Sequence, residues 1–379
     1  METLQGVAPL LWLLAVLGGL VIGLIVAITR VRSVKLRQKP PKLATWPYVT
    51  VLLPAYNEEK VIARCLESIL EQEYPHFEVV VIAGGEDRTF EIAQQYAGEQ
   101  VRVIRQPRRG KAYALNLGLK EARGEVVVTV DADCLFPKEW LKKIVAPLVL
   151  EPDLSAVGGW SRPTNPRGVL VACQYAQEVY ETVLQQKTPV ILPGFASAFR
   201  ACALREVGGF NERVYMLIDY EMQLRLAQKG FKFARNVDAF LYREFASYLR
   251  DYVRQQLRWV RGMLRLSLKY KPVPFSAKLR AVVRPVVYIA ICAAPLAILV
   301  PTIGSLWVGA SLAYLSFVLG KQWGRMFKVS QLLGDKWLLR YIGGALAYIV
   351  INLGVHIAAF LQELVGWKER VTFDVRHFG

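Results

Sequence analysis

Charge-free apolar segments bracket a long stretch of mixed polarity in this chain. The first runs from residue 5 to residue 29, and about 20 apolar residues are enough to span a bilayer. It leads directly into a basic cluster of Arg30, Arg32, Lys35, Arg37, Lys39 and Lys42. A cleaved signal peptide would have a shorter apolar core and a small-residue cleavage site, and short basic flanks stay in the cytosol. We therefore expect an uncleaved transmembrane helix, after which the chain starts on the cytosolic side.

Two further apolar segments lie in the last hundred residues. Residues 285–320 carry no charge and are too long for one untilted helix, so we expect a transmembrane hairpin that turns near Pro301 and Gly304. Residues 341–361 supply a last span, interrupted only by a histidine. Four spans would leave the basic tail, residues 363–379, outside, whereas its charge favours the inside. One apolar segment could instead lie in the membrane interface, and the pattern leaves this open.

Residues 48–245 lose the continuous hydrophobicity and indicate a soluble α/β domain. Short apolar segments rich in β-branched residues predict strands at 49–53, 78–82, 101–104 and 126–130, with helical periodicity at 59–71, 89–96 and 113–122. Three of the strand segments are almost continuously apolar, which is typical of strands buried on both faces of a sheet. Repeated strand–helix units predict a parallel, right-handed, doubly wound sheet with its ligand site at the carboxyl ends of the strands.

Composition and charge narrow the class of protein. With 54% hydrophobic residues, part of the chain is expected to lie outside water. The net charge of +17 lies largely beside apolar segments, where anionic lipid explains it, and we recognise no nucleic-acid-binding module. The five cysteines form no CxxC pair and have no neighbouring histidine, so we expect reduced thiols and no zinc site. These features predict an integral, multi-pass membrane protein without a nucleic acid partner.

The strongest local chemical signal is Asp131-Ala132-Asp133, directly after the strand segment 126–130. Two carboxylates at a strand end can hold a hard divalent cation that also binds diphosphate oxygens. Alone, such a pair is weak evidence, because aspartates often follow strands. A site for Mg²⁺ or Mn²⁺ therefore depends on the surrounding motifs.

Six motifs resemble, in order, those of the family 2 glycosyltransferases. They are 53–59 after the first strand, 110–116 before the third helix, 131–133, 193–200, 218–221, and 255–259, which matches QxxRW in full. The likeness covers most of the soluble domain. It implies a GT-A fold, which is a Rossmann-like nucleotide-sugar domain, here inserted between transmembrane helices, and an inverting transfer from a nucleotide-diphosphate sugar.

The resemblance also assigns chemical roles. Asp131 and Asp133 would hold the metal that neutralises the leaving diphosphate, with Asp131 also near the ribose. Asp219 would be the general base that takes the proton of the acceptor hydroxyl as it attacks the anomeric carbon from the opposite face. Asp219 could instead cap the helix that follows it, or do both.

Gln255, Arg258 and Trp259 are spaced i, i+3 and i+4, so they share one face of a predicted helix. Arginine can bind diphosphate oxygens, and an indole offers a flat apolar surface to a sugar or lipid. The resemblance places these side chains at the diphosphate and the acceptor entrance, near the acceptor-floor residues Gly194, Phe195 and Ala196. For the neighbouring arginines we favour contact with lipid headgroups; these are Arg250, Arg254, Arg261 and Arg265.

By the same resemblance, the nucleoside would contact Tyr56, Glu58, Asp87, Lys111 and Asn116. Lys111 and Asn116 could instead only close their loop. The chain departs from the family pattern at 82–87, where only Asp87 stays in register and the aspartate that reads uracil falls on Ala83. UDP remains the preferred nucleotide. Two smaller departures are Ile218 in place of an acidic residue and Arg243 in place of a histidine near the metal.

Three alternatives for the function remain open: two differ in the acceptor, and the third is non-catalytic. A growing polysaccharide is slightly favoured by QxxRW and by Gln174 with Glu178, which resemble the acceptor-proximal region of polymer synthases. The small membrane part favours a single sugar added to a lipid, as does the ending 367–370, which resembles the tails of some single-addition lipid glycosyltransferases. Departures at Ala83 and Ile218 keep a non-catalytic membrane scaffold as a remote alternative. The expected partners are a UDP-sugar, a lipid or polysaccharide acceptor and membrane lipids, with accessory subunits left open.

These patterns divide the chain into eight predicted segments. They are a transmembrane helix (1–30), a basic linker (31–47), the GT-A domain (48–245), amphipathic interface helices with QxxRW (246–284), a transmembrane hairpin (285–320), a cytosolic loop (321–340), a transmembrane helix (341–362) and a basic tail (363–379).

Overall fold

The computed structural model describes residues 2–366 apart from 32, 33, 35, 38, 108, 186–191, 215, 271, 272, 274 and 300. Most of the predicted tail, with the ending 367–370, lies outside the described residues, as do Arg32 and Lys35 of the basic linker.

A seven-stranded sheet in the order β3-β2-β1-β4-β6-β5-β7 forms the centre of the soluble domain. Its strands are β1 (Val49–Tyr56), β2 (Phe77–Gly84), β3 (Val101–Arg105), β4 (Val126–Val130), β5 (Leu154–Pro163), β6 (Ala196–Arg200) and β7 (Lys232–Arg243). All four predicted strands are confirmed, each starting within one residue of its predicted position. The α/β class is therefore confirmed.

The prediction of a wholly parallel sheet is wrong at β6. Strands β1 to β4 pair in parallel, whereas β6 runs antiparallel to both β4 and β5. The reason is the direction from which the chain enters: Ala196, the first residue of β6, pairs with Val130, the last residue of β4. The segment before β6 therefore lies at the carboxyl ends of the parallel strands.

Helices cover both faces of the sheet. Alternate residues of β1 belong to different cores: Val51 and Leu53 lie in one cluster with residues of α2 and α5, whereas Leu52 lies in another with residues of α4 and α8. Burial on both faces explains the nearly continuous apolar strands. The helices of this domain are α2 (Ile62–Leu70), α3 (Thr89–Gln94), α4 (Lys111–Glu121), α5 (Trp140–Leu150), α6 (Val169–Val179), its π-helical continuation (Tyr180–Leu184), α7 (Ala201–Glu206) and α8 (Ile218–Gln228).

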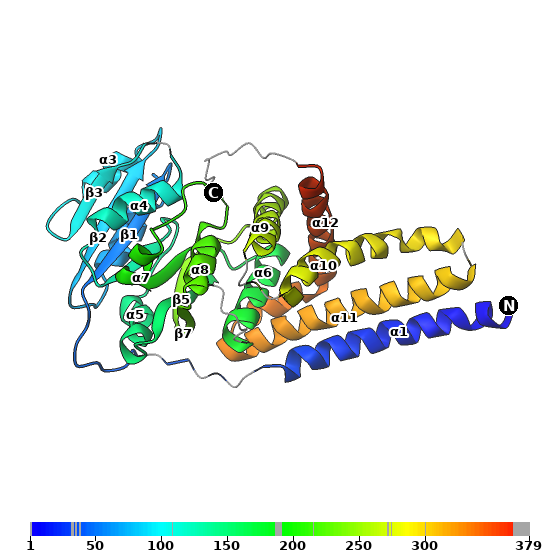
Figure 1. Ribbon diagram of the computed structural model, residues 1–379. Helices are drawn as coiled ribbons and strands as arrows, with labels where there is room; N and C mark the ends of the chain where they lie inside the picture. Colours follow the sequence, from blue (N-terminus) through cyan, green and yellow to red (C-terminus); the bar gives the residue numbers. More distant parts are fainter. Residues whose placement is uncertain are drawn as a thin grey trace.

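The remaining helices extend from this domain or lie against it. In Figure 1, α1 and α11 run side by side away from the sheet, while α9 and α12 lie close to the soluble domain. Their bounds are α1 (Glu2–Thr29), α9 (Leu249–Lys269), α10 (Phe275–Ala293), a 3₁₀ segment (Ala294–Leu299), α11 (Pro301–Leu333), a second 3₁₀ segment (Lys336–Gly344) and α12 (Ala345–Leu364).

Two predicted boundaries in this part are wrong. The expected loop 321–340 is mostly helical, because α11 continues to Leu333 and buries Met326 and Val329 in a core shared with α6. The turn of the hairpin lies before Pro301, which begins α11, a position where its missing N–H is no loss. Helix α10 also starts ten residues earlier than the expected hairpin, within the segment assigned to interface helices.

In the described part of the chain, two stretches are long and apolar enough to cross a membrane. They are Ala8–Thr29 and Lys336–Leu364; the apolar stretch Ala281–Leu296 is shorter. The first is not the core helix of a soluble domain, since large side chains on it such as Leu10, Leu14 and Ile22 are more than half exposed.

Glycines let the backbones of α1 and α11 meet. A Cβ atom on Gly19 would lie 2.4 Å from the carbonyl oxygen of Ala313, and one on Gly23 would lie 2.1 Å from that of Phe317. From the other side, a Cβ on Gly320 would lie 2.1 Å from the carbonyl oxygen of Leu20. Larger side chains at these glycines would force the two helices apart.

Candidate functional site

The carboxylates of the Asp131-Ala132-Asp133 motif stand at the carboxyl end of β4, next to the acceptor-floor motif. The Asp131 N–H donates to the Phe195 carbonyl oxygen at 2.9 Å. This bond fixes the segment before β6 against the end of β4. Two motifs that are 60 residues apart in the chain therefore share one edge of the sheet, as the likeness to the family implied.

Lys111, the first residue of α4, connects the two motifs. Its ammonium group donates to the Asp131 carboxylate and, at 3.0 Å, to the Gly194 carbonyl oxygen. Burial alone would lower the pKa of Lys111, but the carboxylates of Asp131, Asp219 and Asp133 raise it above its ordinary value. Lys111 is therefore a permanent cation among three acidic side chains.

Asp219 lies directly against Gly194. A Cβ atom on Gly194 would be 2.8 Å from the carboxyl carbon of Asp219 and 2.9 Å from each of its oxygens. Loss of water contact raises the pKa of Asp219, Lys111 lowers it and Asp131 raises it, and the balance lies above the ordinary value. A carboxylate with a raised pKa is a better proton acceptor than an exposed one.

The backbone before Asp219 is strained. Leu217 has a left-handed conformation with φ 52° and ψ 48°, and α8 begins at Ile218. Asp219 therefore lies in the first helical turn and Leu217 in the cap position, so the prediction that Asp219 caps this helix is wrong. Gly262 of α9 leaves room for Leu217, since a Cβ there would lie 3.0 Å from its Cδ1 atom. Strain of this kind often marks functional sites.

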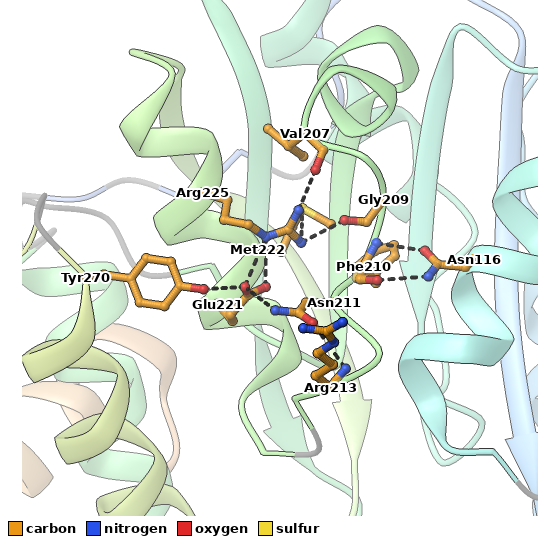
Figure 2. Close-up of polar contacts among 10 residues, drawn as sticks. All are labelled: Asn116, Val207, Gly209, Phe210, Asn211, Arg213, Glu221, Met222, Arg225 and Tyr270. Carbon is orange, nitrogen blue, oxygen red and sulfur yellow. Dashed lines mark hydrogen bonds and ion pairs between the residues drawn. The ribbon is translucent and has the colours of Figure 1, made fainter.

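A buried carboxylate two residues beyond Asp219 fixes α8 in place. The fully buried Glu221 accepts hydrogen bonds from Arg225, Tyr270 and Asn211 (Figure 2). Arg225 also donates to the carbonyl oxygens of Val207 and Gly209, and Tyr270 follows the last residue of α9. This network ties the helix carrying Asp219 to α9 and to the segment after α7. The sequence analysis did not identify it, although Glu221 and Arg225 have the i, i+4 spacing of a helical ion pair.

Asn116 forms contacts expected of its loop-closing alternative. Its amide nitrogen donates to the Phe210 carbonyl oxygen at 2.8 Å and to the Glu212 carboxylate at 2.9 Å, and its amide oxygen accepts from the Phe210 N–H at 2.7 Å. Figure 2 shows the two hydrogen bonds between Asn116 and Phe210. They hold the 208–213 segment and leave this amide little capacity for a nucleoside.

The other side chains expected at the nucleoside lie at the ends of β1 and β2. The Asp87 carboxylate accepts from the Glu59 N–H at 3.1 Å and from the Thr89 N–H and hydroxyl at 3.0 and 2.6 Å. Glu58 is buried, whereas Tyr56 ends β1 opposite Gly84. Asp87 therefore joins two loops at the edge of the sheet where a nucleoside is expected.

Gln255, Arg258 and Trp259 all lie on α9, and Arg258 is exposed. The basic stripe around them divides into two parts. Arg250 and Arg254 are exposed, as expected for contact with headgroups. That expectation is wrong for Arg261, which donates to Glu363 at the end of α12 and is only 2% exposed; Arg265 donates to the same carboxylate but stays partly exposed.

Residues that supported a polymer acceptor are engaged within the protein. Glu178 accepts from the Ser161 hydroxyl at 2.7 Å and pairs with Arg243 at 2.9 Å, and Gln174 donates to the Ala246 carbonyl oxygen at 2.8 Å. Arg243 also stacks on Phe195 with its guanidinium carbon 4.7 Å from the ring centre. The arginine that replaces a histidine of the family pattern therefore packs against the segment expected to form the acceptor floor.

A divalent cation fits this donor set if substrate completes it. Among the described residues, no three side chains of His, Cys, Asp or Glu gather into a metal site. Asp131 and Asp133 nevertheless suffice for Mg²⁺ or Mn²⁺ chemistry, because such ions are commonly held by one or two carboxylates together with substrate phosphates. The ion pair between Asp131 and Lys111 would loosen when a cation binds.

The sequence pattern of Glycosyl transferase family 2 matches residues 50–207. Chondroitin synthase of Pasteurella multocida is 28% identical over 187 residues, which cover 48% of this chain and 19% of that protein. The probable glycosyltransferase YdaM of Bacillus subtilis is 26% identical over 261 residues, covering 64% of this chain and 61% of the relative. The chain thus spans a fifth of the first relative and less than two thirds of the second.

Among solved structures, the mannosyltransferase PcManGT of Pyrobaculum calidifontis, in complex with GDP-Man and Mn²⁺, superimposes with a TM-score of 0.57. The match covers 96% of this chain and all of PcManGT at 24% identity, which shows a shared fold. The chain therefore carries, at residues 50–207, a glycosyl transferase family 2 domain within a GT-A fold, which makes it a transferase.

Proposed function

We propose that the protein is an inverting glycosyltransferase that moves a sugar from a nucleotide-diphosphate sugar to a membrane-associated acceptor. The observation that carries the proposal is the contact of the Asp219 carboxylate with Gly194, beside the Lys111 bridge to Asp131. In this proposal Asp219 is the proton acceptor and Asp131 and Asp133 bind the metal, at the carboxyl edge of the sheet, where α/β folds bind ligands.

Each side chain then has a defined task. A divalent ion held by Asp131 and Asp133 would supply charge for the leaving diphosphate. Asp219 takes the proton of the acceptor hydroxyl, and its raised pKa suits that step. Lys111 lowers the pKa of Asp219 and so opposes the effects of burial and of Asp131. Arg258 is proposed to bind diphosphate and Trp259 to line the acceptor entrance, together with Gln255, Phe195 and Ala196.

The donor is proposed to be a UDP-sugar, with Tyr56, Glu58 and Asp87 at its nucleoside. This rests on the motif resemblance. Because Ala83 stands where the family has the aspartate that reads uracil, the identity of the nucleotide base should be tested first. Mg²⁺ and Mn²⁺ are both consistent with two carboxylates and phosphate oxygens.

We propose that α1, α10 and α11 cross the membrane, with the transferase domain in the cytosol. Helix α1 exposes a row of large apolar side chains and contacts α11 through glycines. Close backbone approach through small residues is typical of helices that associate within a bilayer. A cleaved signal sequence would not be expected to pack closely against a helix such as α11.

The acceptor is proposed to be either a growing polysaccharide or a single lipid. Relatives include the named chondroitin synthase and a 2,3-diacetamido-2,3-dideoxyglucuronosyltransferase of Methanococcus voltae that acts on a dolichyl N-acetylglucosaminyl phosphate. The internal contacts of Gln174 and Glu178 remove one argument for the polymer and favour single addition. A ladder of products would exclude single addition, whereas one discrete glycolipid would exclude the polymer.

The test is release of nucleoside diphosphate by purified protein in lipid, across a panel of UDP- and GDP-sugars, with Mg²⁺, Mn²⁺ or EDTA. We expect metal-dependent release from one donor, and loss of transfer with retained nucleotide binding in the Asp219→Asn variant. Absence of metal-dependent nucleotide binding would instead support the scaffold alternative, and unchanged turnover of the variant would contradict the assignment of Asp219 as the base.

A further inference from the structure

The apolar helix α12 lies beside the polar helix α9 over most of its length. Tyr252 of α9 donates to Asn352 of α12 at 2.8 Å, and its ring lies 5.7 Å from that of Tyr348. Further along, Arg261 donates to Glu363 at 2.6 Å. The residue numbers rise together on the two helices, so they run in the same direction, in contact over roughly 20 Å at 1.5 Å per residue.

Helix α9 cannot lie in the hydrocarbon core of a bilayer. It carries exposed arginines at positions 250, 254 and 258, and a charged side chain at the bilayer centre is costly. A helix that spans the bilayer changes depth by the full thickness of the membrane along its axis. If α12 spanned the bilayer, α9, which lies parallel to it and in contact with it, would also have to lie in the hydrocarbon core.

The first part of α12 is also packed against the soluble domain. The Tyr348 hydroxyl donates to the Gln177 side chain of α6 at 3.1 Å, and Ala345 and Tyr348 share a core cluster with Trp160 of β5. In Figure 1, α9 and α12 stand next to each other and both run across the direction of α1 and α11.

The opposite face of α12 is apolar and uncovered. Leu346, Val350 and Leu361 are 49%, 56% and 47% exposed, and their spacing places them on one side of the helix. At its end, Glu363 is held by Arg261 and Arg265 of α9. One face thus binds a polar helix of the protein while the other has no protein partner among the described residues.

We propose that α12 does not cross the membrane but lies in the cytosolic interface, between α9 and the acyl chains of the lipid. An interfacial helix buries its apolar face at the boundary of headgroups and acyl chains, which fits the exposed face of α12. The inference rests on the membrane part of the proposed function, in which α1, α10 and α11 are the spans. Three spans place the end of the chain on the cytosolic side, where the basic residues of the tail are favoured.

The test uses nitroxide labels on single cysteines in the full-length protein reconstituted in bilayers, with the exposed Cys202 and Cys292 replaced by serine. One series labels α12 at Leu346, Val350 and Leu361. A matched series labels α1 at Leu10, Leu17 and Ile25, which are 55%, 52% and 52% exposed. Relaxation by dissolved oxygen and by a water-soluble nickel chelate reports the depth of each label.

We expect the three α12 labels to have similar, shallow depths, while the α1 series passes through a maximum at Leu17. A maximum within the α12 series would overturn the inference and leave the membrane part of the proposed function intact. If the α1 labels show no contact with lipid, the membrane part itself fails. The second measurement adds protease to sealed inside-out vesicles that carry a tag at the C-terminal residue and a control tag inserted at the exposed Gly98. We expect the protease to remove both tags. Protection of the C-terminal tag alone would contradict three spans.

Discussion

A methyl group at Gly194 should disable Asp219 without disturbing the nucleotide site. The added carbon of Gly194→Ala would lie 2.8 Å from the carboxyl carbon of Asp219, whereas non-bonded carbons are in contact at about 3.5–4.0 Å. Gly194 does not have a positive φ, so alanine introduces no backbone strain there. The clash is therefore relieved by moving the carboxylate, or the chain beneath it, by roughly 0.7 Å or more.

The size of the effect follows from that displacement. Misplacing a reacting group by about 1 Å can cost on the order of 100-fold in rate, so we expect kcat to fall by about 10- to 100-fold, or about 1.4–2.7 kcal/mol in the barrier. Affinity for the nucleotide should remain, because Lys111 contacts only the backbone carbonyl oxygen of Gly194, which the substitution retains.

Steady-state kinetics together with calorimetric titration of nucleoside diphosphate measure both quantities. Gly98→Ala is the matched control, since a Cβ at Gly98 meets nothing within 4 Å. A Gly194→Ala variant with the turnover of the wild type would refute the proposed position of Asp219 in the reaction. Loss of nucleotide binding together with turnover would show that Gly194 supports the whole site.

Three further substitutions test individual interactions. Lys111→Met should move the acidic limb of the pH–rate profile to higher pH, because Lys111 lowers the pKa of Asp219 and the base must be ionised to act. Glu221→Ala removes the fully buried acceptor of the network around α8, and chemical denaturation should record a loss of about 3 kcal/mol, as for other broken buried pairs. Glu363→Ala leaves the buried Arg261 without this carboxylate, so the melting temperature in detergent should fall.

Neighbouring positions supply the controls. Lys120→Met removes an exposed lysine from the same helix as Lys111 and should leave the acidic limb in place. Gln362→Ala is the counterpart of Glu363→Ala. A limb that stays fixed in Lys111→Met would mean that another group sets the profile, and an unchanged melting temperature in Glu363→Ala would show that its ion pairs add nothing to stability.

Local pattern was enough to predict the parallel strands and the edge at which the motifs meet. The strands are short, apolar and separated by helical periodicity, and the motifs at 53–59 and 131–133 lie at strand ends. The direction of β6 could not be read in this way, because it depends on where the segment before it returns to the sheet. That return is fixed by the bond from Asp131 to Phe195, between parts of the chain that no local pattern connects.

Charges were the most misleading signal in the C-terminal part. The expected cytosolic loop 321–340 contains Lys321, Arg325 and Lys328, yet α11 continues through them, and Arg325 pairs with Glu181 at 2.9 Å. Arg261 likewise finds its partner about a hundred residues away in sequence. From sequence alone, a charged side chain is expected to contact water or lipid headgroups. An ion-pair partner far away in the sequence is identified only from the fold.

The contact between α1 and α11 has a consequence for biosynthesis. Helix α1 leaves the ribosome first, whereas its partner is made roughly 270 residues later, which is on the order of tens of seconds at ~5–20 residues per second. If α1 spans the bilayer, as proposed above, its glycine face is without α11 during that interval while the transferase domain folds. Until α11 is made, a newly synthesised α1 can therefore associate with other helices that have small residues, including α1 of a second nascent chain.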